Sequence, residues 1–137
     1  MGQTEGDPIP EVVVSVVTLA AAVHERVDAR RAIDEAQTYL GLNLAELATA
    51  LDVDRRTLLR YRTDTSTPSK SVRARIQSLR NFMSLLDDTF PTREAARDWL
   101  YSPVPSLRSR RPIDLIRSGK LDEVDNELAG LDGGVFT

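Results

Sequence analysis

The sequence contains no cysteine and only one histidine, His24. Without thiols, a disulfide framework, a thiolate nucleophile and a zinc site built on sulfur are excluded. A single histidine leaves no histidine-rich metal cluster and makes a histidine general base a poor expectation. Aromatic residues form 5% of the chain, too few for the stacking platforms that bind single-stranded nucleic acid. We therefore expect no metal site and no bound cofactor.

The sequence also lacks a hydrophobic run of membrane-spanning length. Its longest apolar stretch covers 12–23 and is interrupted by two hydroxyl residues, whereas a span needs about twenty apolar residues. Acidic residues precede this stretch, where a secretory signal would carry positive charge. With 137 residues, 41% hydrophobic and 28% charged, the chain has the balance of a small globular protein. We expect it to be cytoplasmic and to make no membrane contact.

Positive charge is concentrated in one segment. The net charge of −3 argues, taken alone, against nucleic acid. Residues 54–80 nevertheless contain eight basic and two acidic residues, a local charge of +6 that leaves −9 on the other 110 residues. Phosphate binding depends on the field within about 8–10 Å rather than on the global sum. The basic residues of this segment are Arg55, Arg56, Arg60, Arg62, Lys70, Arg73, Arg75 and Arg80.

Apolar residues at helical spacing predict an all-α fold. The stretch 12–17 is rich in β-branched residues and indicates a strand-like or frayed start, followed by a helix that strengthens over 29–39 and stops at Gly41. Asn43, Asp54 and Thr92 stand where caps are expected. The remaining helices are predicted over 44–51, 55–62, 71–86, 93–101, 113–117 and 121–129.

Residues 43–62, NLAELATALDVDRRTLLRYR, predict a helix-turn-helix. Two helices that meet across a short turn need a small residue at their crossing, here Ala48, and apolar residues that bury the corner. Asp52 stands where the chain commonly turns through a left-handed conformation, which aspartate tolerates better than most residues. The corner residues are Leu47, Leu51, Val53, Leu58 and Tyr61.

The second helix of this pair is expected to enter the major groove of double-stranded DNA. Arginine near its start can bond guanine edges, and the residues that open the next helix can contact phosphates. A solvated basic face on an ordinary helical hairpin is the alternative. Single modules of this kind usually read DNA as dimers, so we expect a homodimer through the helix-turn-helix region. The predicted DNA-binding residues are Arg55, Arg56, Thr57, Arg60, Arg62, Ser69, Lys70 and Arg73.

The last third of the chain carries an ordered set of motifs. RDWLYSPVPSL is followed by RRPIDLIRSG, a short acidic helix and the terminal GGVFT. From residue 28 onward the chain resembles the MbcA/ParS/Xre antitoxins, the partners of RES-domain toxins. The resemblance implies three parts: an N-terminal extension (1–27), a helix-turn-helix domain (28–88) and a small helical toxin-binding domain (89–137).

This resemblance implies an antitoxin that binds a NAD-consuming RES-domain toxin and represses its own operon. In the family the C-terminal end is thought to block the NAD pocket of the toxin. Gly134 lets the backbone approach closely, Phe136 fills an aromatic-sized slot, and the terminal carboxylate can accept from an arginine. Arg108 and its neighbours serve the toxin, DNA phosphates or only solvent. The implied toxin-binding residues are Gly133, Gly134, Val135, Phe136, Thr137, Arg110 and Arg111.

Two other functions are compatible with parts of the sequence. A stand-alone helix-turn-helix transcriptional regulator explains the basic helix but gives the terminal GGVFT no use. A small enzyme needs a convergent polar cluster, and the acidic groups at 87–88 and 122–125 have the pattern of solvated helix ends. We therefore expect a binding protein rather than an enzyme, and no catalytic residues.

Overall fold

The computed structural model describes residues 11–63 and 66–132. The regular secondary structure of these residues is helical, apart from one isolated bridge between Val104 and Arg110. In these parts no helix is both long and apolar enough to cross a membrane. The elements are α1 (Glu11–Leu40), α2 (Leu44–Leu51), α3 (Arg55–Arg62), α4 (Lys70–Thr89), α5 (Arg93–Leu100), the 3-10 turn η2 (Pro105–Leu107), α6 (Pro112–Arg117) and α7 (Leu121–Asp132).

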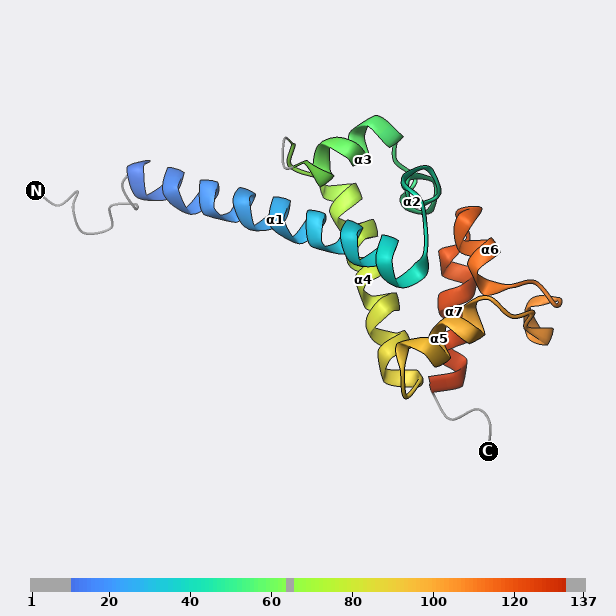
Figure 1. The fold of residues 1–137 in the computed structure, drawn as a ribbon. Coiled ribbons are helices and arrows are strands. Elements are labelled where there is room, and N and C mark those ends of the chain that lie inside the picture. Colours follow the sequence, from blue (N-terminus) through green and yellow to red (C-terminus); the bar gives the residue numbers. More distant parts are fainter. Residues whose placement is uncertain (1–10, 64–65, 133–137) are drawn as a thin grey trace, which may run out of the picture.

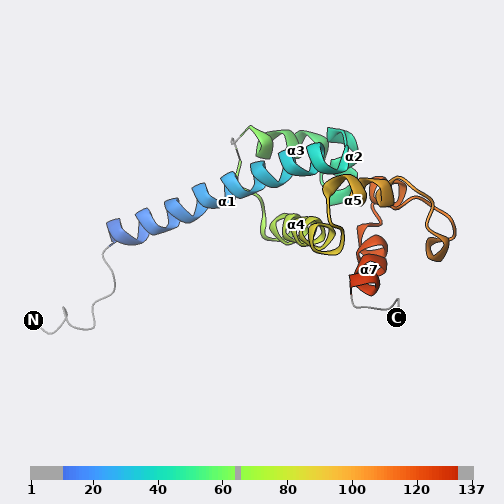
Figure 2. The same cartoon turned by 60° about the horizontal axis from the view of Figure 1, so that its bottom comes forward.

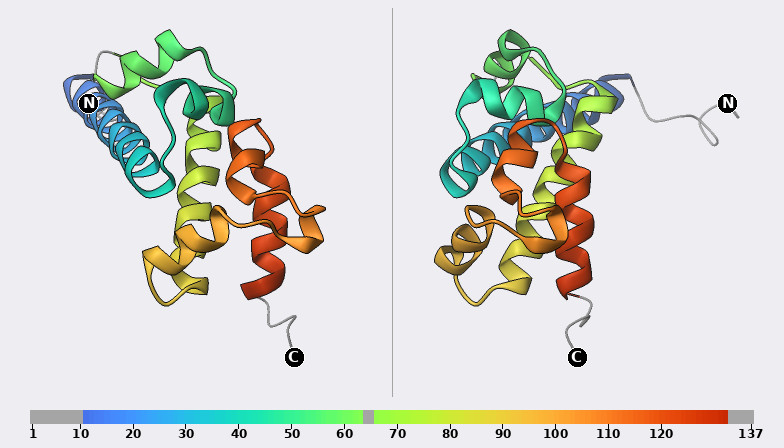
Figure 3. Two further views of the ribbon diagram at one scale, coloured as in Figure 1. Left: turned by 45° about the vertical axis from the view of Figure 1, so that its right-hand side comes forward. Right: turned by 90° about the vertical axis from the view of Figure 1, so that its right-hand side faces the viewer.

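Helix α4 lies at the centre of the molecule and packs against α1, α2, α5 and α7. Helices α2 and α3 lie against the C-terminal half of α1, while the N-terminal half of α1 projects away from the body (Figures 1 and 2). Helix α7 runs beside α4, and α6 packs against both α7 and α2 (Figure 3). The all-α fold expected from the sequence is confirmed.

The start of α1 differs from the sequence prediction. The β-branched stretch 12–17 is helical, and a single helix runs from Glu11 to Leu40 without a strand-like or frayed beginning. Helix propensity is a weak prior that its context overrides. An isolated strand would have no partner among the described residues, whereas a helix satisfies its own backbone groups.

Several helix ends have the predicted chemistry. Gly41 ends α1 with a positive φ of 72°, a backbone conformation that costs glycine little. Asn43 forms a capping box with Glu46, and the hydroxyl groups of Ser69 and Thr92 cap α4 and α5. These local signals explain why the predicted helix bounds lie close to those observed.

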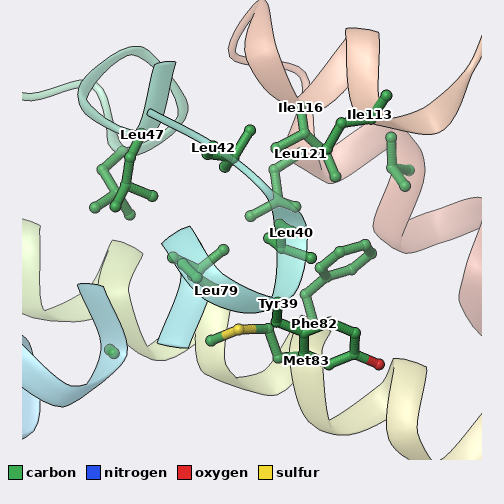
Figure 4. Close-up of a cluster of buried hydrophobic side chains, with 14 of the residues drawn as sticks. Tyr39, Leu40, Leu42, Leu47, Leu79, Phe82, Met83, Ile113, Ile116 and Leu121 are labelled. Carbon is green, nitrogen blue, oxygen red and sulfur yellow. The ribbon is translucent and has the colours of Figure 1, made fainter. Parts of the chain in front are cut away.

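One hydrophobic core extends through the molecule. Its buried side chains come from every helix from α1 to α7 and from the segments between them. Tyr39 and Leu40 of α1 lie against Phe82 and Met83 of α4, with Ile116 of α6 nearby (Figure 4). The helix-turn-helix and the C-terminal helices therefore share a core rather than having one each.

Candidate functional site

Helices α2 and α3 form the predicted helix-turn-helix. Asp52 is left-handed, with φ 52° and ψ 48°, and the Val53 amide donates to the Ala48 carbonyl at 2.9 Å. Leu51 and Leu58 are fully buried at the corner. The tight turn and its buried corner hold α3 in a fixed orientation, with one side packed and the other side open.

The open side of α3 carries arginine. Arg55, Arg56 and Arg60 are exposed and Thr57 is half-buried, while Leu58 and Tyr61 face the core. The arginines of α3 predicted to contact DNA therefore lie on its exposed side, where such a contact requires them.

Leu59 is a residue of this face that sequence analysis missed. It is 47% exposed and lies one turn after Arg55 and Arg56. A leucine on the outer side of a recognition helix can make apolar contact with a thymine methyl group. Its position four residues after Arg55, on the side away from Leu58, is the signal that could have found it.

The local charge of +6 is reduced by carboxylates from outside the basic segment. Four of its arginines lie within ion-pair distance of acids that precede it, three on α1 and one in the turn after α2. Among the described residues, Arg55 and Arg56 have no acidic partner. The surplus positive charge therefore centres on the start of α3. The four pairs are Arg62–Asp34 (3.7 Å), Arg73–Glu25 (2.9 Å), Arg75–Asp52 (3.6 Å) and Arg80–Asp28 (3.7 Å).

The beginning of α4 supplies the other predicted DNA contacts. Ser69 caps the helix, because its hydroxyl accepts from the Val72 amide at 3.3 Å. Lys70 is exposed, whereas Arg73 is held by Glu25 of α1. Lys70 is thus available to bind a phosphate. Arg73 must first break its ion pair with Glu25 before it can bind one.

Asp54 does not cap α3 as the sequence predicted. It occupies the N-cap position with extended backbone angles, but its side chain makes no capping hydrogen bond. The carboxylate is exposed immediately before Arg55 and Arg56. Position alone suggested a cap, but the side chain's orientation cannot be read from the sequence.

Both candidate toxin-binding arginines of the C-terminal part are engaged within the molecule. The Arg110 guanidinium donates to the Leu107 carbonyl at 2.7 Å and pairs with Glu123 of α7. Arg111 forms a two-bond pair with Asp114, at 2.8 and 2.9 Å. These contacts shape the loop between α5 and α6 and the first turn of α6.

The same loop contains backbone strain at its tip. Arg108 and Ser109 have φ values of 61° and 60°, which non-glycine residues seldom adopt. Val104 and Arg110 pair across the base of the loop, and the Val104 amide donates to the Arg110 carbonyl at 3.1 Å. The closed base holds the strained tip in place.

Of the acidic groups that could have served an enzyme, Asp87 and Glu123 have structural partners. Asp87 accepts from the Tyr39 hydroxyl at 2.9 Å and from Arg93. Burial opposes ionisation of Asp87, but the hydrogen bonds from Arg93 and Tyr39 outweigh it and keep the pKa of its carboxyl below the usual value. Burial, together with Asp122, raises the pKa of Asp125.

The terminal residues 133–137, to which the family resemblance assigns the toxin contact, lie outside the described residues. The described chain leads toward them through α7, whose Val124 and Leu128 are buried in the core. The last described residue is thus anchored by a packed helix.

Comparisons with known proteins identify both halves of the chain. A model of the antitoxin Xre-like helix-turn-helix domain matches residues 18–74. A model of the antitoxin Xre/MbcA/ParS C-terminal toxin-binding domain matches residues 85–134. The two matches fall on the helix-turn-helix and on the helices that follow it.

Individual relatives agree with these matches. The mycobacterial cidal antitoxins MbcA of Mycobacterium bovis and Mycobacterium tuberculosis are 29% identical over 97 residues, which is 71% of this chain and 85% of the relatives. A chain in the crystal structure of the M. tuberculosis MbcT-MbcA toxin-antitoxin complex aligns with a TM-score of 0.53 and 26% identity, covering 79% of this chain and 96% of that one. The chain therefore belongs to the Xre/MbcA/ParS antitoxins and is the antitoxin of a toxin-antitoxin system.

Proposed function

We propose that this antitoxin neutralises a NAD-consuming RES-domain toxin by binding it, and that it represses its own operon by binding double-stranded operator DNA. It acts through these contacts and not through catalysis. The observation that carries the proposal is the presence in one chain of a helix-turn-helix and a match to a toxin-binding domain. A stand-alone transcriptional regulator has no use for the second part.

The DNA contact is assigned to α3 and the start of α4. The face of α3 that carries Arg55 and Arg56 enters the major groove, and Leu59 contacts a thymine methyl group. Ser69 and Lys70 bind phosphate at the start of α4. Arg55 and Arg56, which have no ion-pair partner among the described residues, give the start of α3 a surplus positive charge that supports this assignment. The proposed DNA-binding residues are Arg55, Arg56, Thr57, Leu59, Arg60, Arg62, Ser69, Lys70 and Arg73.

Combined replacement of Arg55, Arg56 and Arg60 by alanine tests this contact. Affinity for the promoter fragment should fall, and the slope of its logarithm against log salt should flatten by about 0.9 for each lost phosphate contact. Arg108→Ala is the control, because it removes an exposed arginine from the loop before α6, away from α3 (Figure 3). Full affinity in the triple variant would show that another surface reads the operator.

The toxin contact is assigned to the C-terminal end. Gly133, Gly134, Val135, Phe136 and Thr137 enter the NAD pocket, where Phe136 fills an aromatic slot and the terminal carboxylate binds an arginine. Arg110 and Arg111 contribute at the edge of the interface. The match of residues 85–134 to a toxin-binding domain supports this assignment, as does the likeness to a chain crystallised in a toxin-antitoxin complex.

Deletion of 135–137 tests the blocking mechanism. Cells that express the toxin should lose protection, while affinity for the promoter fragment stays unchanged, because α3 is untouched. Asn126→Ala, an exposed change on α7, is the control and should protect as the unaltered chain does. If the deleted chain still protects, the NAD pocket is not blocked by these residues.

We assign the functional division of the chain at the bounds that the sequence predicts. Residues 1–27 form an extension, 28–88 the DNA-binding part and 89–137 the toxin-binding part. Two copies of the chain bind one operator, because a single helix-turn-helix buries little surface on DNA and commonly acts as a pair on two half-sites.

A further inference from the structure

We propose that the projecting N-terminal half of α1 is the surface through which two copies of this chain pair. The proposal rests on the dimer proposed above and specifies its interface. Val16, Leu19 and Val23 are 59%, 62% and 42% exposed, which are unusual values for large apolar side chains. His24, Asp28 and Arg31 line one part of a shallow groove along one side of the helix, and its apolar part is lined by Val16, Leu19, Ala20, Val23 and Val27. We call these five residues the α1 stripe.

The spacing of the stripe is that of a helix pair. Val16, Ala20, Val23 and Val27 follow one another at intervals of four, three and four residues. Alternating intervals of three and four keep one seam of a helix facing a partner helix, as in coiled coils. At Glu25 the opposite side of the helix meets the body, because Glu25 pairs with Arg73 of α4 at 2.9 Å.

The projecting segment is not expected to form a stable helix when it is exposed to water on all sides. Between residues 11 and 23 the only charged side chain is Glu11, and valine is the commonest residue. Valine is a mediocre helix former, and helices in proteins owe most of their stability to packing. A helix that is apolar on most sides is normally buried. Some surface therefore covers this segment.

A second copy fits the stripe better than other partners do. Beyond the stripe, Leu59 is the one large apolar side chain counted as exposed in the described parts of the chain, and it lies alone on α3. The stripe of one copy can therefore pack against the same stripe of a second copy, as a two-fold contact requires. A membrane surface fits less well, because helices that lie on lipid carry lysine and arginine, which residues 11–23 lack. The C-terminal helix α7 lies at the other end of the molecule (Figure 1).

Neighbouring alanines provide a matched test. Ala20 lies midway between Val16 and Val23 on the stripe, whereas Ala21 is exposed about 100° further around the helix. Light scattering should give the unaltered chain twice its mass of 15.2 kDa. Ala20→Glu should halve that mass, because two like charges meet in an apolar seam, and Ala21→Glu should leave it unchanged. Circular dichroism of both variants shows whether the body remains folded.

Cross-linking gives a second readout that does not depend on a destabilising change. Because the chain has no cysteine, oxidation of Ala20→Cys should produce a covalent dimer, and oxidation of Ala21→Cys should not, since a disulfide needs Cα atoms within about 7 Å. The interface is wrong if both variants cross-link alike or if Ala20→Glu keeps the doubled mass. A monomeric unaltered chain would overturn the dimer as well, while the α3 variants test DNA binding independently.

Discussion

Gly41 shows how one residue fixes the end of α1. Its φ of 72° is left-handed, and a Cβ atom there would lie 2.6 Å from the Tyr101 hydroxyl oxygen. That hydroxyl donates to the Leu40 carbonyl at 2.7 Å. We predict that Gly41→Ala lowers the free energy of unfolding by about 2 kcal/mol, since the left-handed backbone alone costs about 1–2 kcal/mol. Urea unfolding followed by circular dichroism measures this loss.

Gly130 is the matched control for that substitution. It lies within α7, and no atom lies within 4 Å of a Cβ built at this position. Gly130→Ala should raise the free energy of unfolding by about 0.5–1 kcal/mol, because alanine loses less backbone entropy in a helix. Equal stability of the Gly41→Ala variant and the unaltered chain would show that the left-handed turn carries no constraint.

Tyr39 makes stability depend on pH in alkaline solution. Burial and its hydrogen bond to Asp87 raise the pKa of Tyr39 from 10.0 to about 12. Between these values the unfolded chain loses the phenolic proton while the folded chain keeps it, so the free energy of unfolding falls as pH rises. Below pH 10 the contribution is constant. Tyr39→Phe should remove this part of the slope in urea unfolding between pH 10 and about 12. An unchanged slope would assign the dependence to other groups.

Single charges are where the sequence is least informative. A count along the chain gives residues 54–80 a charge of +6. In the fold, carboxylates from earlier in the chain lie beside this segment and offset part of that charge. Glu25 and Asp28 meet Arg73 and Arg80 across 48 and 52 positions of sequence, which no local window detects. The basic face of α3 could be predicted, whereas its restriction to the start of the helix depends on the tertiary fold.

At the scale of helices, α2 and α3 contrast in how they begin. The Asn43 side-chain oxygen accepts from the Glu46 backbone amide at 2.8 Å, and the Asn43 backbone amide donates to the Glu46 carboxylate at 2.9 Å. Asp54 holds the equivalent position before α3 without a capping bond. We predict that Asn43→Ala costs about 1 kcal/mol of unfolding free energy, whereas Asp54→Ala changes it by less than about 0.5 kcal/mol.

Thermal unfolding of these two variants under identical conditions measures the contrast. A third measurement separates stability from function: Asp54→Ala should bind the promoter fragment more tightly, since it removes a negative charge beside Arg55 and Arg56. Equal losses of stability in both variants would mean that Asp54 caps α3 in solution.

Helices with clear start and stop signals could be predicted closely from the sequence. The bounds 44–51 and 55–62 agree with the structure because the Asn43 cap, a left-handed turn residue and apolar spacing coincide there. The start of α1 could not be predicted, since its valines favour a strand locally while no partner strand exists among the described residues. The α1 stripe is also hidden in the sequence, because a run of apolar residues does not reveal which side the body covers.

At the scale of the whole molecule, the parts assigned to DNA and to toxin are mechanically continuous. Arg117 of α6 pairs with Glu46 of α2 at 2.9 Å, and Arg97 of α5 donates to the Tyr39 carbonyl of α1 at 3.1 Å. Helix α4 packs against both α1 and α7. The proposed functional division near residue 88 therefore crosses the shared core instead of a linker.

This continuity predicts that the chain unfolds as one cooperative unit. Trp99, the single tryptophan, lies in the toxin-binding part, half-buried with its ring 5.7 Å from that of Phe90. Its fluorescence reports on that part alone, whereas circular dichroism reports on every helix. The two signals should give the same urea midpoint, because loss of α7 would expose α4, against which α1 and α2 also pack. Separate midpoints would show that the two parts fold independently. Because the core is shared, we expect a chain cut after residue 88 to lose the stability of the helix-turn-helix. If the two parts fold independently, that shortened chain would keep it.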